Sequence, residues 1–155
     1  MTLPVVEFGL ARPLPVEVTE VTRPFWEGLA AGRFLVPRCA GCRRLSFPPR
    51  RICPGCHGRG FDWVAVSGRG ALYAVTKVHS SPPVYGILGP VRVAVVDLEE
   101  GIRLVTRLIP DGSDPIPDSP VQLVITRHPD GFHYAARVSG QPPRANPKPP
   151  SVPPR

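Results

Sequence analysis

The sequence predicts a mainly β fold with a single short helix, and two observations support this prediction. In the second half of the chain, five segments rich in branched apolar residues alternate with short turns that contain glycine, proline or aspartate. Ahead of them, all four cysteines of the chain lie between residues 39 and 56 as two Cys-x-x-Cys pairs. We therefore expect a β barrel preceded by a small metal-binding module.

Residues 1–32 are expected to form an N-terminal arm and a helix. Prolines interrupt residues 1–22, which we interpret as an irregular arm. Residues 24–32 suit one short helix, because Thr22 can cap its start, proline is tolerated in a first turn and Gly32 suits its exit. Its aromatic and aliphatic side chains would bury one face against the rest of the protein.

The four cysteines are the most informative residues of the chain. Ten residues separate the two pairs, so two turns can face each other and present four sulfurs tetrahedrally to one ion, the arrangement that Zn²⁺ prefers. Two disulfides or a redox-active pair are the alternatives. Residues 1–20 lack a secretory signal, and the cytosolic location that we expect favours zinc. Four thiolates close the coordination shell and predict a structural zinc with these ligands: Cys39, Cys42, Cys53 and Cys56.

Residues 33–67 have the order strand, cysteine turn, hairpin, cysteine turn, strand, which is the layout of a rubredoxin-like zinc ribbon. Gly41 and Gly55 each precede the second cysteine of their pair, where a positive φ would turn backbone N–H groups toward the sulfurs. The expected ribbon strands are 34–36, 45–47 and 61–66.

Basic side chains surround the expected ribbon site. Four thiolates carry more negative charge than one Zn²⁺ cancels, and neighbouring guanidinium groups would offset the excess. His57 follows the last cysteine and is expected to be a bystander and not a ligand. The arginines in question are Arg38, Arg43, Arg44, Arg50, Arg51 and Arg59.

Residues 68–139 are expected to form the barrel. Five strands with helix-poor connections suit a five-stranded OB-fold, and an SH3-like barrel is the alternative, because strand number alone does not fix the path. The long, partly apolar loop at 80–90 would lie at the barrel mouth and is a candidate contact surface. The expected strands are 71–78, 91–98, 102–109, 121–127 and 132–138.

The chain is strongly basic, with a formal net charge of +7 and a sequence pI near 9.9 over 155 residues. Such a charge favours an anionic partner: nucleic acid, anionic lipid or a phosphorylated ligand such as coenzyme A. No apolar run approaches the length of a membrane span. Residues 140–155 are basic, rich in proline and nearly free of apolar side chains, which predicts an extended tail.

The order of these features resembles a known family of acyl-CoA-associated proteins, which combine an N-terminal helix, a zinc ribbon and an OB-fold and were long catalogued as a domain of unknown function. The similarity runs from about Pro24 to Arg127, and the motifs between and after the cysteine pairs make it specific. The stretches that carry it are FWEGLAAGRF (25–34), CAGC (39–42), FPPR (47–50), CPGC (53–56), WVAVSGRG (63–70) and DLEEGIRLVT (97–106).

The resemblance implies a non-catalytic accessory or scaffold subunit. Proteins of the family are bound to thiolase-like enzymes or to hotdog-fold acyl-CoA hydratases in lipid, sterol or polyketide metabolism, so a hetero-oligomer is expected. This chain departs from the family pattern at Arg92, at Ser119-Pro120 and in its proline-rich tail.

The residues themselves favour binding over catalysis. His79, at the start of the 80–90 loop, has no serine or carboxylate neighbour that would make a recognisable triad, and Asp97 and Glu99 suit a turn and a strand edge. A nucleic-acid-binding protein is the alternative function, but the barrel strands offer few aromatic platforms for bases. For the phosphates of coenzyme A or an acyl-CoA, the candidate ligands are Lys77, Arg92, Arg103, Arg107 and Arg127.

Overall fold

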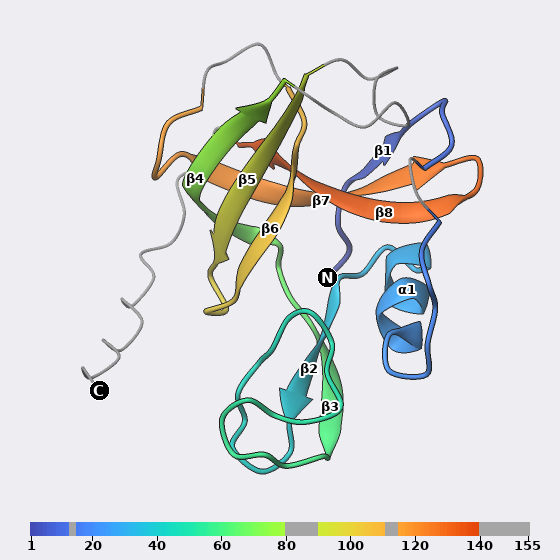
Figure 1. The fold of residues 1–155 in the computed structure, drawn as a ribbon, viewed down its shortest axis with the longest axis vertical. Coiled ribbons are helices and arrows are strands. Elements are labelled where there is room, and N and C mark those ends of the chain that lie inside the picture. The colour runs from blue at the N-terminus through green and yellow to red at the C-terminus, as the bar shows by residue number, and fades with distance from the viewer. Residues whose placement is uncertain (13–14, 80–89, 111–114, 140–155) are drawn as a thin grey trace.

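The structure is a computed structural model that describes residues 1–12, 15–79, 90–110 and 115–139. Those residues form a barrel with a two-stranded ribbon and one helix beside it (Figure 1). No described helix is long and apolar enough to cross a bilayer. The elements are β1 (Val5–Glu7), α1 (Arg23–Ala30), β2 (Leu35–Cys39), β3 (Phe61–Ala65), β4 (Arg69–Val78), β5 (Val91–Leu98), β6 (Arg103–Leu108), β7 (Pro120–His128) and β8 (Gly131–Val138).

Five strands close into a barrel in the order β4-β5-β6-β8-β7, with β7 pairing back onto β4. Within the barrel all the ladders are antiparallel except the contact of β6 with β8, a single parallel pair between Leu108 and Ala136 that completes the closure. The predicted mainly β fold with a five-stranded OB-fold is confirmed.

The barrel interior follows the two-residue period of its strands. On β5, Val96 and Leu98 are fully buried while Asp97 between them is partly exposed, and on β6 the buried Leu104 and Leu108 alternate in the same way with residues that are at least partly exposed. Each fully buried aliphatic side chain of this size contributes about 1.5–3 kcal/mol relative to an exposed one. The interior is therefore a packed core and not a channel.

Aromatic side chains join the helix, the ribbon and the barrel. Phe25 of α1 makes edge-to-face contacts with Phe34, Phe47 and Tyr134 at centroid distances between 5.1 and 5.8 Å. These four residues come from the helix, the start of the ribbon, the ribbon hairpin and β8. Burial raises the pKa of Tyr134 to about 12. The cluster therefore packs the ribbon against the barrel, and the two lie next to each other in Figure 1.

Three local expectations differ from the structure. Residues 1–22 were expected to be irregular, but β1 lies parallel to β7, with Val5 paired to Ile125. Thr22 occupies the N-cap position without capping α1, because its hydroxyl accepts the Thr19 N–H instead. The segment 45–47 forms only one bridge, between Leu45 and Arg38, and no full strand. The helix exit is as expected, with Gly32 at φ 76°.

Candidate metal centre and binding faces

The four cysteine sulfurs converge at the end of the ribbon, all within 4.8 Å of one another. The Sγ atoms are 3.5 Å apart for Cys39 and Cys56 and 3.5 Å apart for Cys42 and Cys53, so each contact joins the two pairs. None of the four is in a disulfide. Four sulfurs bound tetrahedrally to Zn²⁺ at about 2.3 Å lie about 3.8 Å from one another. The cluster fits a zinc ion with little rearrangement.

The backbone of both cysteine turns brings the sulfurs together, but not by the expected route. Gly41 and Gly55 do not have positive φ; the left-handed residues are Arg43 at 63° and His57 at 60°, one position after each second cysteine. Their N–H groups donate to the carbonyl oxygens of Cys39 and Cys53, which closes each turn. At Gly55 the missing Cβ leaves room for the Arg44 guanidinium, which would lie 3.1 Å from it, whereas a Cβ at Gly41 would make only ordinary contacts with the sulfurs.

Hydrogen bonding gives the cysteine thiols different pKa values. Backbone hydrogen bonds from Cys56 and Gly55 lower the pKa of Cys53 to about 6, and the Gly55 nitrogen lies 3.4 Å from the sulfur. For Cys42 a backbone hydrogen bond from Arg44 lowers the pKa, but the hydrogen bond with the Cys53 sulfur and burial outweigh it and raise the pKa to about 11. Zinc would displace the remaining protons and bind four thiolates.

The five basic residues predicted to bind a ligand fall on two faces of the barrel. Arg103 and Arg107 point outward from β6, because the residues that alternate with them, Leu104, Thr106 and Leu108, are buried. Lys77 and Arg92 are cross-strand neighbours on β4 and β5. Arg92 lies on the same side of β5 as the buried Val96 and Leu98, at the end of the strand where that side is no longer buried. They line a shallow groove of about 160 Å³ at one end of the barrel. Arg127 has the inward register of β7.

Several of these arginines are already engaged. Arg103 donates to both carboxylate oxygens of Asp97 at 2.6 and 2.7 Å, and Arg127 lies 3.2 Å from a Glu7 oxygen. Arg107 lies over the ring of Phe8 at 4.8 Å, and burial lowers its pKa. The structure therefore separates the five residues into several sites and does not gather them into one.

A surface that the sequence did not indicate surrounds Tyr73. Tyr73 is 54% exposed, and the Arg103 guanidinium lies 3.6 Å from the ring centroid while paired with Asp97. Val105, 60% exposed, lies on the same outer face of β6. Tyr73 follows the buried Leu72 on the outer face of β4, at a β-bulge between Leu72 and Ala74, and no composition signal marks that bulge.

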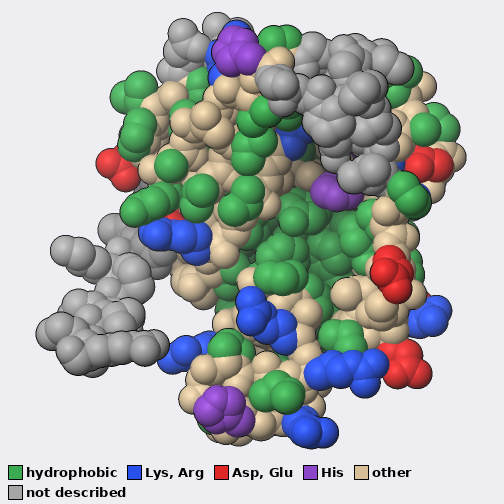
Figure 2. All heavy atoms as spheres, in the orientation of Figure 1, with side chains coloured by type: hydrophobic (Ala, Val, Ile, Leu, Met, Phe, Trp, Pro, Cys, Tyr) green, Lys and Arg blue, Asp and Glu red, His purple; other side chains and the backbone are tan. Residues whose placement is uncertain are grey.

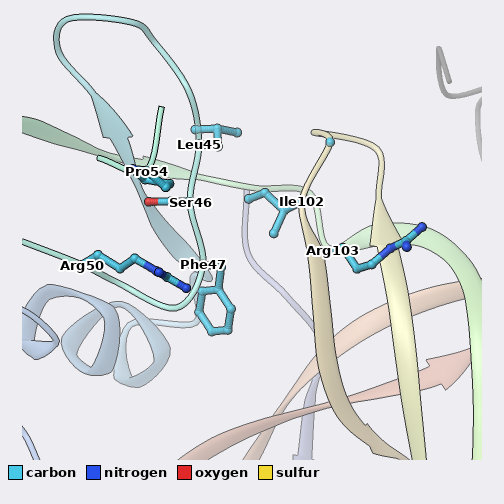
Figure 3. Close-up of a pocket in the computed structure, with 8 residues that line it drawn as sticks. Leu45, Ser46, Phe47, Arg50, Pro54, Ile102 and Arg103 are labelled. Atoms are coloured by element: carbon cyan, nitrogen blue, oxygen red, sulfur yellow. The ribbon is translucent and has the colours of Figure 1, made fainter. Parts of the chain in front are cut away.

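A cleft separates the ribbon from the barrel (Figure 3). It has a volume of about 230 Å³, with the ribbon hairpin on one side and the turn between β5 and β6 on the other. The loop at 80–90, predicted to be a contact surface, lies outside the described residues except for its last position, and so does the proline-rich tail.

Two adjoining family models match this chain. The ChsH2 rubredoxin-like zinc ribbon domain matches residues 26–62, and the ChsH2 C-terminal OB-fold domain matches residues 63–126. Together they cover well over half of the 155 residues. The chain belongs to the ChsH2 family. The predicted resemblance is thereby confirmed, as is the zinc-ribbon nature of the region that holds the cysteine cluster.

Relatives in the ChsH2 family carry names from acyl-CoA metabolism. The chain is 38% identical over 94 residues to a probable enoyl-CoA hydratase alpha subunit of Thermomonospora curvata, covering 59% of this chain and 29% of the relative. It is 34% identical to a DUF35 domain-containing scaffold protein of Methanocaldococcus jannaschii (46% and 52% covered) and 34% identical to the benzoylsuccinyl-CoA thiolase subunit BbsA of Thauera aromatica (46% and 48%). The chain thus spans about half or less of the length of these relatives.

Among solved structures of the ChsH2 family, the Ltp2-ChsH2(DUF35) aldolase contains a similar chain. The TM-score is 0.68 at 30% sequence identity, and the match covers 80% of this chain and 98% of that one. The ribbon, the barrel and their order are therefore shared along almost the full length of the compared chain.

Proposed function

We propose that this protein is a non-catalytic accessory subunit, stabilised by zinc, that docks on an acyl-CoA enzyme of the thiolase-like or hydratase type. The observation that carries the proposal is the match to the ChsH2 chain of an aldolase assembly at 30% identity over 98% of that chain. Relatives named as a hydratase subunit, a thiolase subunit and a scaffold protein support the same role.

The chemistry of the described residues supports a role without catalysis. His128 contacts the Thr126 hydroxyl at 3.1 Å, but its other ring nitrogen faces the Leu10 carbonyl oxygen and Thr126 is 4% exposed, so a substrate could not reach that hydroxyl. His133 is partly buried and stacks on the ring of Tyr134. Among residues 1–12, 15–79, 90–110 and 115–139 we find no catalytic triad, that is, no nucleophile hydrogen-bonded to a base that is in turn hydrogen-bonded to a carboxylate.

The cysteines support the compartment that we propose, the cytosol. The four cysteines form one cluster at metal-ligand spacing, an arrangement more typical of metal sites in intracellular proteins than of disulfides in secreted ones. The ion that we propose there has a structural role, because four thiolates leave no open coordination position for a substrate.

For the partner we propose the outer face of β6 as a contact surface. Arg103 and Arg107 point outward there, next to the exposed Tyr73 and Val105, and Tyr and Arg are residue types enriched in interface hot spots. Replacing both arginines, Arg103→Ala with Arg107→Ala, should weaken partner or coenzyme A binding at least about tenfold, the equivalent of about 1.4 kcal/mol, while the melting temperature falls by only a few degrees. Unchanged affinity would remove both residues from the contact.

Affinity purification of the tagged protein from a nuclease-treated lysate of its own organism tests the proposal. We expect one thiolase-like or hydratase-like enzyme in stoichiometric amount, identified by mass spectrometry. The Cys39→Ser, Cys42→Ser variant serves as the control that lacks a folded ribbon. Recovery of nucleic-acid-associated proteins alone from a parallel lysate without nuclease, and their loss from the nuclease-treated one, would contradict the proposal and favour a nucleic-acid-binding role.

A further inference from the structure

The four cysteines of the cluster are not equally covered. Cys39 and Cys53 are buried, whereas Cys42 and Cys56, the second cysteine of each turn, are exposed. Each exposed cysteine has its sulfur 3.5 Å from the sulfur of a buried cysteine in the other turn. The cluster therefore consists of two sulfur pairs, Cys39 with Cys56 and Cys42 with Cys53, and the surroundings of the two pairs differ.

Open positions lie beside the sulfurs of Cys39 and Cys56. A Cβ atom on Gly41 would lie 3.7 Å from the Cys56 sulfur and 3.9 Å from the Cys39 sulfur. A Cβ atom on Gly58 would lie 3.3 and 3.6 Å from the same two sulfurs. Apart from each glycine and its two chain neighbours, no other described atom lies within 4 Å of either position. Because Gly41 is itself exposed, a small molecule can contact both sulfurs there.

The second sulfur pair lacks such an opening at its own glycine. The position that a Cβ atom on Gly55 would take lies 3.1 Å from the Arg44 guanidinium, which occupies the space beside this turn. The Gly55 backbone nitrogen lies 3.4 Å from the Cys53 sulfur. The approach beside Gly55 is therefore closed by a side chain, whereas the approach beside Gly41 is open.

The surroundings of the cluster are electropositive. Figure 2 shows Lys and Arg side chains around the ribbon, at the lower end of the molecule. Among the described residues Arg43, Arg44 and Arg59 pair with no carboxylate. Positive charge near a cysteine favours the thiolate, which is the nucleophilic form, and reactive cysteines combine such charge with access from solvent.

We propose that Cys39 and Cys56 form an oxidation site for hydrogen peroxide, at which the two thiolates are converted to a disulfide. The Cys56 thiolate attacks one peroxide oxygen, the O–O bond breaks, and a sulfenic acid and a hydroxide ion form. The Cys39 thiolate then attacks the Cys56 sulfur, so that an S–S bond forms and the sulfenic hydroxyl group leaves as a second hydroxide ion. The two sulfurs lose two electrons in total, and the peroxide gains them.

This oxidation would remove two of the four thiolates that hold the ion. The ribbon has one two-stranded ladder and packs on the barrel through Phe47, so loss of the ion would loosen that contact. A thiol reductant and added zinc would restore the site, because a disulfide is a reversible product. The inference does not depend on the accessory-subunit role, since its test needs no partner enzyme.

The test is treatment of the full-length, zinc-loaded protein with hydrogen peroxide. Zinc release is followed with a chromogenic chelator, and the cysteines are then mapped by alkylation, digestion and mass spectrometry. We expect loss of the bound zinc together with one disulfide that joins Cys39 to Cys56, and recovery of zinc binding after treatment with dithiothreitol and zinc. A first disulfide between any other two cysteines, sulfinic acid without a disulfide, or thiols that stay unoxidised in excess peroxide would overturn the proposal.

A matched pair of glycine variants tests the approach to the sulfurs. Gly41→Ala places a methyl group in the open position at ordinary contact distances, so it should bind zinc as the parent does and slow disulfide formation and zinc release several-fold. Gly60→Ala is the control, because its Cβ would contact only the Ala40 side chain, at 3.4 Å, and oxidation should proceed at the parental rate. Equal oxidation rates in Gly41→Ala and the parent would contradict the proposed approach. The disulfide map of the parent protein tests the site without either variant.

Discussion

The barrel and the ribbon lie side by side but are stabilised by different means. The barrel strands contribute fully buried side chains from β4, β5, β6, β7 and β8, and their ladders join every strand to two neighbours. Between residues 40 and 60, by contrast, only Ser46 and Cys53 are buried. The ribbon has one two-stranded ladder and no apolar core beyond the side chains that it packs against the barrel.

This difference shows where each region obtains its folding free energy. The barrel buries enough apolar surface to fold without a bound metal. A two-stranded ribbon does not, and small domains of this kind depend on a bound metal. The cysteine cluster lies at the exposed end of the ribbon, where no core could replace it, and this explains why the metal site and the barrel core do not overlap.

The largest effect is expected from removing the ion's ligands. Cys39→Ser with Cys42→Ser leaves two of the four sulfurs and should abolish zinc binding, a loss that can reach about 10–16 kcal/mol for structural zinc in isolated modules. The ribbon should unfold while the barrel keeps its β circular-dichroism signal. Zinc content is measured by elemental analysis. A variant that still held one zinc per chain would show that these cysteines are not the ligands.

An effect of intermediate size is expected from the barrel core. Leu123 is fully buried, and Leu123→Ala should lower the free energy of unfolding by about 2–5 kcal/mol, measured by denaturant titration. Zinc content at 20 °C should stay the same, because the metal site lies outside the core. The control Val105→Ala removes an exposed side chain of β6 and should change stability by less than about 0.5 kcal/mol. Loss of zinc in Leu123→Ala would contradict the separation of the two regions.

The smallest effect concerns the N-terminal arm, which belongs to neither region. The Arg12 backbone N–H donates to Asp130 at 2.9 Å, and the guanidinium adds a bond at 3.1 Å. These bonds, the backbone bond first, hold the pKa of Asp130 below its usual range. Because the folded pKa is the lower one, the stabilisation is complete above the unfolded pKa of about 3.9 and is lost as the pH falls through the folded value.

An NMR pH titration of the Arg12 amide measures this contribution. The amide should report a midpoint below pH 3.8, and Asp130→Asn should abolish the transition. Asp62→Asn is the control, since its carboxylate lies 3.8 Å from Arg38 on the exposed ribbon. A midpoint at or above the ordinary carboxylate value would show that Arg12 does not hold Asp130.

The sequence predicted the parts of the structure that depend on the spacing of nearby residues. Paired cysteines specify a metal-binding ribbon because thiolate spacing is itself the chemical requirement, and the alternation of residues 91–98 defines a strand with one buried face. β1 was not predicted, because three residues are too few to show the alternation of buried and exposed side chains that is typical of a strand. Its partner strand, at Ile125, is also distant in the chain. The left-handed residues of the turns proved to be Arg43 and His57, not the glycines.

The binding residues were harder to predict for a different reason. The face on which a strand residue lies depends on register, and the bulge between Leu72 and Ala74 shifts that register within β4. Partners such as Asp97 for Arg103 are set by the hairpin pairing, which composition does not contain. The cleft at Ser46 and Arg50 forms only when the ribbon packs on the barrel. Because its lining residues come from separate parts of the chain, no single sequence motif predicts it.

The most direct test of the account is chelation of the metal from ¹⁵N-labelled protein, followed residue by residue in the amide NMR spectrum. We expect residues 35–65 to move to the shifts of an unfolded chain, while the strands β4 to β8 keep their dispersed signals. Readdition of zinc should restore the ribbon. Simultaneous loss of both sets of signals, or a ribbon that stays folded without metal, would contradict the division between a zinc-dependent ribbon and a self-sufficient barrel.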